Sequence, residues 1–67
     1  MMIELRSKLI DAVVYHGEKQ QLTVHLRGGQ RREYVDVPEH VYNGLLFAKS
    51  AGVYYKTTIK PNYVRAP

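Results

Sequence analysis

Apolar and polar residues alternate most regularly in the stretch LTVHLR, residues 22–27. An alternation with a period of two is typical of a strand with one buried face, so we predict a strand over residues 21–27. The upstream segment LIDAVVYH is rich in β-branched and aromatic residues, which favours another strand over residues 8–16. The polar stretch HGEKQQ between them supplies a turn, and the two strands are expected to pair antiparallel.

A second reversal is marked by Gly28 and Gly29, since glycine adopts a positive φ without steric cost. It leads into a third predicted strand over residues 31–36. A two-residue loop would place charged side chains on the buried face, whereas a three-residue loop, Gly28–Gln30, keeps the apolar faces together. The pairs predicted by the longer loop are Val24 opposite Tyr34 and Leu26 opposite Arg32.

The change from strand to helix falls on Pro38, whose fixed φ and missing N–H suit the first turn of a helix. From there apolar residues recur every three or four positions, which predicts an amphipathic helix over residues 38–49. Gly44 costs about 1 kcal/mol relative to alanine in the middle of such a helix, and a close approach to the sheet would explain it. The buried stripe comprises Val41, Leu45 and Ala48, with Tyr42 and Leu46 beside it.

The following segment, SAGVYYKTTIK, is compatible with a strand by residue propensity. Ser50, however, is a good helix N-cap, and Tyr55 and Ile59 stand at near-helical spacing. We therefore predict a short second helix over residues 50–59. The expected fold is a single α+β domain, residues 1–67, in which a three-stranded antiparallel meander (8–16, 21–27 and 31–36) is packed by both helices.

A chain of 67 residues is close to the smallest that folds unaided, and without cysteine it has no disulfide to stabilise it. No apolar run approaches the roughly 20 residues that span a bilayer. Charged residues interrupt the N-terminal segment, MMIELRSKLIDAVV, so it lacks the apolar core of a signal peptide. The sequence predicts a cytoplasmic protein without a membrane segment.

The net charge of +4 is distributed unevenly along the chain. All six acidic residues lie at or before Glu39, whereas the later cations have no acidic neighbour in the sequence. Such asymmetry is a hint of an anionic partner, although solvated surface lysines would produce the same pattern. The unopposed cations are Lys49, Lys56, Lys60 and Arg65.

Several residues carry a resemblance to a known family, the most specific run being Val37-Pro38, Val41-Tyr42, Leu45, Ala48, Ser50 and Gly52. Together with Ser7, Ile10 and Tyr15 and the strand before the glycine turn, they resemble the KTSC domains across residues 7–63. That family is named for the C-terminal segment of certain lysyl-tRNA synthetases, and the resemblance implies RNA as a candidate partner. Members usually carry a Tyr-x-Tyr pair before the Val-Pro step, whereas this chain has Arg32 at the first position.

No arrangement of residues typical of catalysis is present in the sequence. The three histidines, His16, His25 and His40, lack metal-ligand spacing, and no serine or threonine stands in a strand–turn–helix elbow. The stretch RGGQRR lacks the Gly-Lys-Ser/Thr ending of a phosphate-binding loop. We predict a non-catalytic binding module with no metal and no cofactor.

The candidate site combines aromatic and basic residues, as single-stranded nucleic acid requires rings for its bases and cations for its phosphates. Tyr15, Tyr34 and Tyr42 are expected in the core. Tyr54 is expected to be exposed, because Tyr55 shares a helical stripe with Ile59. The predicted nucleic-acid-binding residues are Arg27, Arg31, Arg32, Tyr54, Lys56, Lys60, Tyr63 and Arg65.

The competing hypothesis is a protein-interaction or homodimerisation module that uses a sheet edge or an exposed apolar patch. The stretch DAVVY is expected to be the less protected edge. The position of the charges separates the hypotheses: a nucleic-acid binder gathers its cations on one face, and an interaction module scatters them. The expected apolar patch comprises Val14, Leu46 and Phe47.

Overall fold

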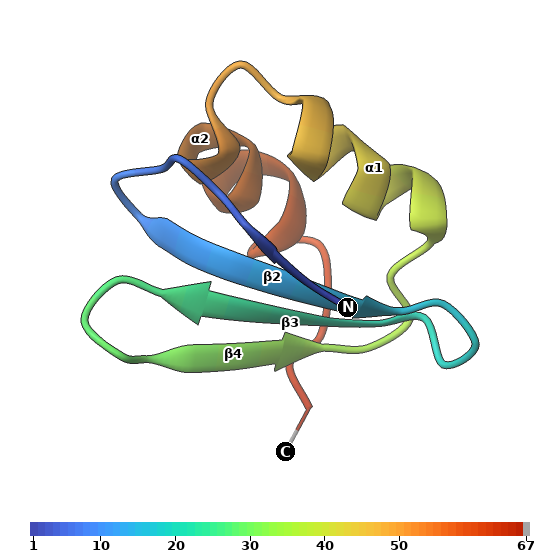
Figure 1. Ribbon diagram of the computed structural model, residues 1–67. Coiled ribbons are helices and arrows are strands. Elements are labelled where there is room, and N and C mark those ends of the chain that lie inside the picture. Colours follow the sequence, from blue (N-terminus) through green and yellow to red (C-terminus); the bar gives the residue numbers. More distant parts are fainter. Residues whose placement is uncertain (67) are drawn as a thin grey trace.

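The computed structural model describes residues 1–66, which form an antiparallel sheet with helices over one of its faces (Figure 1). The strands follow the order β1-β2-β3-β4 in the sheet. They are β1 (Met2–Glu4), β2 (Ile10–His16), β3 (Gln21–Leu26) and β4 (Arg31–Tyr34). The helical elements are α1 (Glu39–Phe47), α2 (Ala51–Tyr54) and the π-helical turn η1 (Tyr55–Ile59), which continues α2 without a break. The α+β class and the antiparallel meander that the sequence predicts are confirmed.

The predicted three-stranded meander gains a fourth strand, β1, at its N-terminal side. β1 pairs antiparallel with β2, with Ile3 opposite Val13. The segment is only three residues long and no glycine or proline separates it from β2, so it has little of the pattern by which strands are recognised. The edge of β2, expected to be the less protected one, is therefore covered by β1.

The loop between β3 and β4 has the predicted length but begins one residue earlier. Because the Leu26 N–H donates to the Gln30 carbonyl at 2.8 Å, the three residues Arg27–Gly29 form the reversal, rather than Gly28–Gln30. Both glycines have a positive φ, near +90°, which places them inside the turn and leaves Gln30 at the start of the ladder.

The predicted strand pairs are consequently wrong by two residues. Tyr34 lies opposite Leu22 rather than Val24, and Arg32 lies opposite Val24 rather than Leu26. A shift of two residues preserves the face of every side chain. Tyr34 is therefore buried, 1% exposed, as the sequence predicts.

α1 lies within the predicted range and begins directly after Pro38, whose φ is −65°. The Pro38 carbonyl accepts the Val41 N–H at 3.0 Å and so starts the helical hydrogen bonding. The preceding carbonyl, of Val37, accepts the Tyr15 hydroxyl at 2.6 Å, which ties the start of the helix to β2. The residues of α1 that are buried against the sheet are Val41, Tyr42 and Leu45.

The second helix is confirmed, with Ser50 as its N-cap: the Ser50 Oγ accepts the Val53 N–H at 3.3 Å. After Tyr54 the hydrogen bonding widens, and the Lys60 N–H reaches back to the Tyr55 carbonyl at 2.9 Å. Tyr55 and Ile59 are 3% and 0% exposed, so both point into the core. The helical spacing of these two residues is visible in the sequence, but the π-helical geometry is not.

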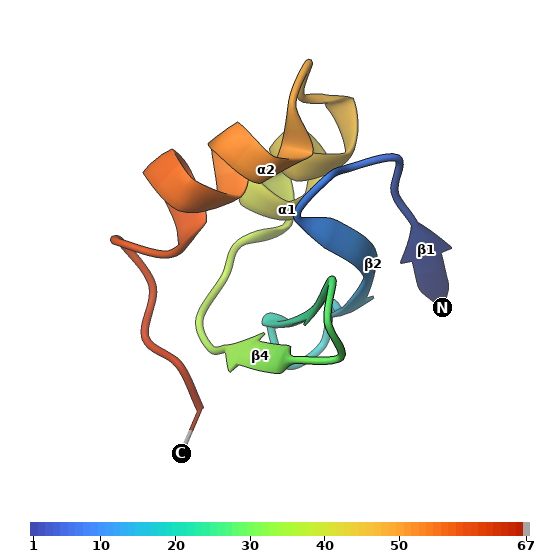
Figure 2. The ribbon, with the colours of Figure 1, turned by 90° about the vertical axis from the view of Figure 1, so that its left-hand side faces the viewer.

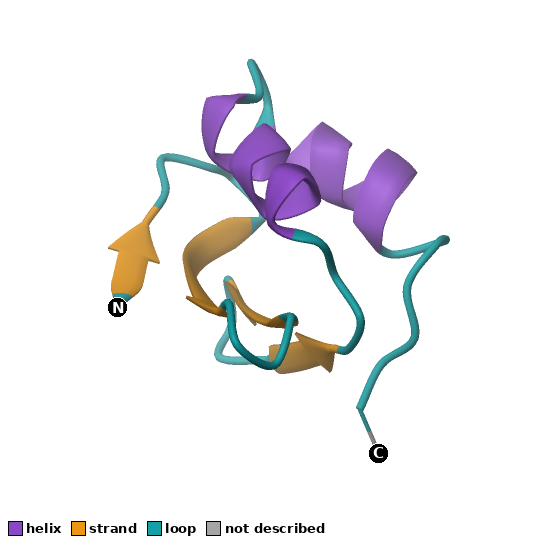
Figure 3. Ribbon diagram, turned by 90° about the vertical axis from the view of Figure 1, so that its right-hand side faces the viewer, coloured by secondary structure: helices purple, strands orange, loops and turns teal. Residues whose placement is uncertain are grey.

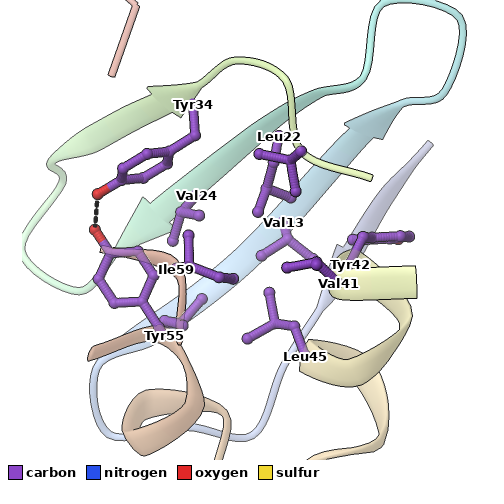
Figure 4. Close-up of a cluster of buried hydrophobic side chains, with 11 residues drawn as sticks. Val13, Leu22, Val24, Tyr34, Val41, Tyr42, Leu45, Tyr55 and Ile59 are labelled. Atoms are coloured by element: carbon purple, nitrogen blue, oxygen red, sulfur yellow. Dashed lines mark hydrogen bonds between the residues drawn. The ribbon is translucent and has the colours of Figure 1, made fainter. Parts of the chain in front are cut away.

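The core lies between the helices and the sheet (Figure 4). At one end the hydroxyls of Tyr34 and Tyr55 are 2.6 Å apart, and their rings meet edge to face at 5.9 Å between centroids. At the other end Tyr15 stacks on Tyr42 at 4.6 Å. Tyr34 and Tyr42 are buried and Tyr15 is partly buried. The tyrosines expected in the core therefore do pack there, as rings that also connect separate elements.

The chain after η1 returns along β4 (Figure 2). The Val35 N–H donates to the Val64 carbonyl at 3.0 Å, and the Ala66 N–H donates to the Glu33 carbonyl at 2.7 Å. Arg65 forms an antiparallel bridge with Tyr34. The β4 edge therefore has a partner from the same chain, in addition to the charges that the sequence places there.

Candidate nucleic-acid interface

The three arginines predicted around the second turn already have contacts within the molecule. The Arg27 Nε donates to the Ser7 carbonyl at 2.9 Å and lies 3.5 Å from an Asp11 carboxylate oxygen. Arg31 lies 3.7 Å from Glu33. The remaining guanidinium, of Arg32, donates to the Gln30 side chain at 3.1 Å. Two of the three are thus paired with acidic residues, which reduces the positive charge they present to a ligand.

Tyr54 is partly buried, so the prediction that it is exposed was wrong. Its hydroxyl donates to the Val41 carbonyl of α1 at 2.9 Å. Its ring lies over Gly44, where an added Cβ would come within 2.8 Å of the Tyr54 Cζ. Gly44 therefore makes room for the second helix. The predicted close approach of Gly44 to the sheet is wrong.

Arg32 and Arg65 lie near the buried pair of Tyr34 and Tyr55 at the β4 end of the molecule. Tyr63 is partly buried against the core. Burial raises the pKa of Tyr55 well above its ordinary value, and the hydrogen bond with Tyr34 raises it further. The positive charges of Arg32 and Arg65 oppose this shift in the pKa of Tyr55, because they favour the ionised hydroxyl. Lys60, at the end of η1, is exposed.

Lys56 lies apart from these arginines, at a cavity of about 350 Å³ between the β1–β2 connection and the first turn of α2. Four basic residues and two serines are among its lining residues, and none of the described residues that line it is acidic. These six are Arg6, Lys8, Lys49, Lys56, Ser7 and Ser50. We refer to this cavity as the basic pocket.

Within residues 1–66, the four cations of the basic pocket have no acidic partner. The ion pairs found within residues 1–66 are Arg27 with Asp11 and Arg31 with Glu33, and neither includes a residue of the pocket. Their charges are therefore balanced only by solvent and dissolved ions. An uncompensated group of cations around a concave surface concentrates positive potential and attracts anions.

Of the residues predicted for nucleic-acid binding, only Lys56 lines the basic pocket. The other three cations were not predicted as part of the site. Lys49 stands among the cations that no later acid opposes, and this signal could have identified it. Arg6 and Lys8 lie between Glu4 and Asp11 in the sequence, so the sequence alone suggests that their charges are compensated. In the folded chain Asp11 pairs with Arg27 and not with Arg6 or Lys8.

The comparison with protein families is decisive for the class of the domain. The model of the KTSC domain matches residues 6–63, most of the chain. This chain belongs to the KTSC domain family. A protein of Tsukamurella paurometabola is 32% identical over 62 residues, which are 92% of either chain. The family resemblance read from the sequence is thereby confirmed.

The fold is shared with a solved member of the family. The crystal structure of a KTSC domain protein from Yersinia pestis superposes with a TM-score of 0.93, covering 98% of this chain and 93% of that one. The two sequences are 21% identical. At that level of identity the likeness concerns the fold alone.

Tyr34, the tyrosine shortly before the Val-Pro step, has a structural role in this KTSC domain. Tyr34, the tyrosine that remains, is 1% exposed and hydrogen-bonded to Tyr55. A ring so deeply buried has no free face on which a base could stack. Tyr34 therefore does not serve as half of a base-stacking platform, whichever residue stands at position 32.

The expected apolar patch is reduced to one strongly exposed residue. Phe47, the last residue of α1, is 86% exposed, whereas Val14 and Leu46 are partly buried. Within residues 1–66 no three histidine, aspartate or glutamate side chains form a group that could hold a metal ion. Nor does the described part of the chain contain a helix long and apolar enough to cross a bilayer.

Proposed function

We propose that this KTSC domain is a non-catalytic module that binds single-stranded nucleic acid, with RNA as the preferred form, through the basic pocket. The observation that carries the proposal is the group of four cations around a cavity without an acidic lining residue. Contacts of lysine and arginine with phosphates supply most of the non-specific affinity for nucleic acid. The excess of ten basic over six acidic residues favours the same partner.

A single strand suits the domain better than a duplex. Proteins that read the major groove insert a helix or a two-stranded ribbon, and α1, EHVYNGLLF, has no lysine or arginine with which to contact a duplex backbone. Phe47 stands two residues before Lys49 with most of its ring in solvent. An exposed ring beside a cation is the combination on which unpaired bases stack, at about 1–3 kcal/mol for each base.

The proposed site revises the set of residues predicted from the sequence. Lys56 is retained, and Arg6, Lys8 and Lys49 are added because they line the same cavity. The remaining predicted residues become secondary, since Arg27 and Arg31 are paired with acids and Tyr54 supports α1. Charge on Lys60 and Arg65 adds to the general attraction.

Fluorescence anisotropy with labelled single-stranded RNA, single-stranded DNA and duplex RNA across a salt series tests the proposal. We expect single-stranded RNA to bind most tightly, with a log–log salt slope of about −0.7 for each phosphate neutralised. The double variant Lys8→Glu with Lys49→Glu should lose at least about tenfold in affinity. The matched control, Arg31→Glu with Lys60→Glu, reverses the same number of charges outside the pocket and should lose much less. Equal losses in the two variants, or no complex at low salt, would overturn the proposal.

Homodimerisation or the binding of a protein partner is the second candidate function, and the exposure of Phe47 is the observation in its favour. The β4 edge is covered by residues 64–66 and the other edge strand, β1, is only three residues long, so this mode would depend on the apolar residue rather than on strand addition. Sedimentation at several protein concentrations would detect a dimer. If Phe47→Ser abolished self-association while leaving RNA affinity unchanged, self-association would replace nucleic-acid binding as the proposed role of Phe47.

A further inference from the structure

We infer that the basic pocket recognises the terminal phosphate of a nucleic-acid strand, a phosphomonoester, rather than a phosphate within the strand. The inference rests on the proposed function and specifies which part of the strand the pocket binds. Three features of the cavity support it: its free hydroxyl donors, its charge and its volume.

The two serines of the pocket each keep a hydrogen to donate. The Ser7 Oγ accepts the N–H groups of Leu9 and Ile10, both at 3.1 Å. The Ser50 Oγ accepts the Val53 N–H. A hydroxyl has one donor in addition to its lone pairs, so both O–H groups remain available to an acceptor in the cavity. Phosphate oxygens are acceptors only and suit such donors.

The cations of the pocket favour the more highly charged terminal phosphate. A phosphomonoester carries about −1.5 to −2 near neutral pH, since its second pKa is about 6. A phosphodiester within a strand carries a single negative charge. The same four cations therefore attract the terminal group more strongly than an internal one.

Two other cavities of the described chain lack this charge pattern. A larger cavity of about 490 Å³ beside β1 is lined by Glu4 and Asp11, and these carboxylates would repel a phosphate. A third, of about 300 Å³ at the β2–β3 turn, includes both Glu18 and Lys19. Among these three, only the basic pocket combines several cations with an absence of carboxylates.

The volume of the pocket also favours the end of a strand. At about 350 Å³ it lies at the lower end of the range for small-molecule sites, which is about 300–1,000 Å³. A space of that size holds one phosphorylated group with its neighbouring atoms. A continuing strand would need a groove that extends over several nucleotides.

The test compares three RNA oligonucleotides of one sequence, carrying a 5′-phosphate, a 3′-phosphate or no terminal phosphate. At pH 7.5 we expect one of the phosphorylated forms to bind about tenfold more tightly than the unphosphorylated form. The advantage should shrink towards pH 5, where the terminal phosphate is a monoanion. No histidine or carboxylate is among the described residues lining the pocket, so this pH dependence belongs to the ligand.

Neutralising the pocket should remove the advantage of the terminal phosphate. In Lys8→Gln with Lys49→Gln the three oligonucleotides are expected to bind equally, whereas the control Lys19→Gln with Lys60→Gln should retain the preference. If wild-type protein bound all three equally with a steep salt dependence, the inference would be wrong and the proposed function would stand.

The remaining outcomes also decide the inference. If none of the oligonucleotides bound, the proposed function would fail together with it. A phosphoserine peptide that bound more tightly than the phosphorylated RNA would overturn the assignment to nucleic acid. A preference for the terminal phosphate that persisted in the pocket variant would place the site elsewhere.

Discussion

The two ends of the second helix, residues 51–59, lie in different surroundings, although both belong to the helical layer on one side of the sheet (Figure 3). The first turn borders a cavity with unpaired cations and two serine hydroxyls. The last turn places Tyr55 and Ile59 in the apolar core, where the polar atoms have partners. One short element thus lines the pocket with its first turn and with the exposed Lys56, and stabilises the core through Tyr55 and Ile59.

The tyrosines and the cations of the basic pocket also differ in whether they connect elements of the fold. Three hydrogen bonds of tyrosine hydroxyls connect elements: Tyr15 donates to the Val37 carbonyl, Tyr54 donates to the Val41 carbonyl, and Tyr55 pairs with Tyr34. These rings act as internal cross-links. The cations of the pocket make no such connection, so their replacement should change binding without changing the fold.

The largest expected effect is at the core end of the helix. Ile59→Ala should reduce the free energy of unfolding by about 2–5 kcal/mol, since it removes a side chain that is 0% exposed and leaves a cavity. A domain of this length has only about 3–10 kcal/mol in total. Urea unfolding monitored by circular dichroism would measure the loss. A cost below about 1 kcal/mol would contradict the view that η1 anchors the core.

The tyrosine pair should give the next largest effect. Tyr55→Phe leaves the buried Tyr34 hydroxyl without its partner, which should cost about 1–3 kcal/mol. The double variant with Tyr34→Phe should be less destabilised than the sum of the two single variants, because both polar groups are then absent. Strict additivity in this double-mutant cycle would show that the 2.6 Å contact contributes nothing.

The same pair should make the domain sensitive to alkaline pH. Burial raises the folded-state pKa of Tyr55 above its unfolded value of about 10. The contribution of Tyr55 to the free energy of unfolding is therefore fully present below about pH 10. As the pH rises from there towards the folded-state pKa, the free energy of unfolding falls by at most about 1.4 kcal/mol per pH unit. Unfolding measured at pH 9, 10 and 11 would show the decline. The Tyr55→Phe variant should decline less steeply.

Gly44→Ala tests how closely α1 and the second helix approach. Alanine has the better helix propensity by about 1 kcal/mol, yet its Cβ would displace the Tyr54 ring and its hydrogen bond. We expect a net destabilisation of about 1 kcal/mol. In a Tyr54→Leu background the alanine should become neutral or stabilising. The same cost in both backgrounds would disprove the role given to Tyr54.

The smallest effect on stability is expected at the pocket. Lys8→Gln with Lys49→Gln should change the free energy of unfolding by no more than about 0.5 kcal/mol, because these side chains are exposed and unpaired. Removing mutual repulsion would make the sign of the change favourable. Thermal unfolding of this variant beside wild type would measure it, and a loss above 1 kcal/mol would mean that the pocket is structural after all.

Strong local signals explain which parts of the fold could be predicted from the sequence. The alternation in β3 indicates a strand with one buried face, the glycine pair after it permits a turn with positive φ, and Pro38 suits the start of a helix; the corresponding elements are present. β1 has no comparable signal, since its three residues are fixed by pairing with β2. The loop position escaped prediction because two adjacent glycines allow more than one placement of the turn.

The site was harder to predict than the fold because charge is compensated in space and not in sequence. Arg6 and Lys8 have acidic neighbours along the chain, but Asp11 pairs with Arg27 across the sheet. The prediction that Tyr54 is exposed failed for a related reason. Tyr54 follows the exposed side of a regular helix, yet Gly44 leaves a space into which its ring folds.

The wide turn η1 gives the domain a means of absorbing a change in chain length. Its last N–H reaches back five residues, from Lys60 to Tyr55, where an ordinary α-helix reaches back four. The loss of one of the two threonines between Tyr55 and Ile59 would let the turn tighten into regular α-helix, with the flanking apolar residues still on one face at a spacing of three. A lineage of such domains could therefore gain or lose a residue here while the cationic end, upstream of the change, kept its shape.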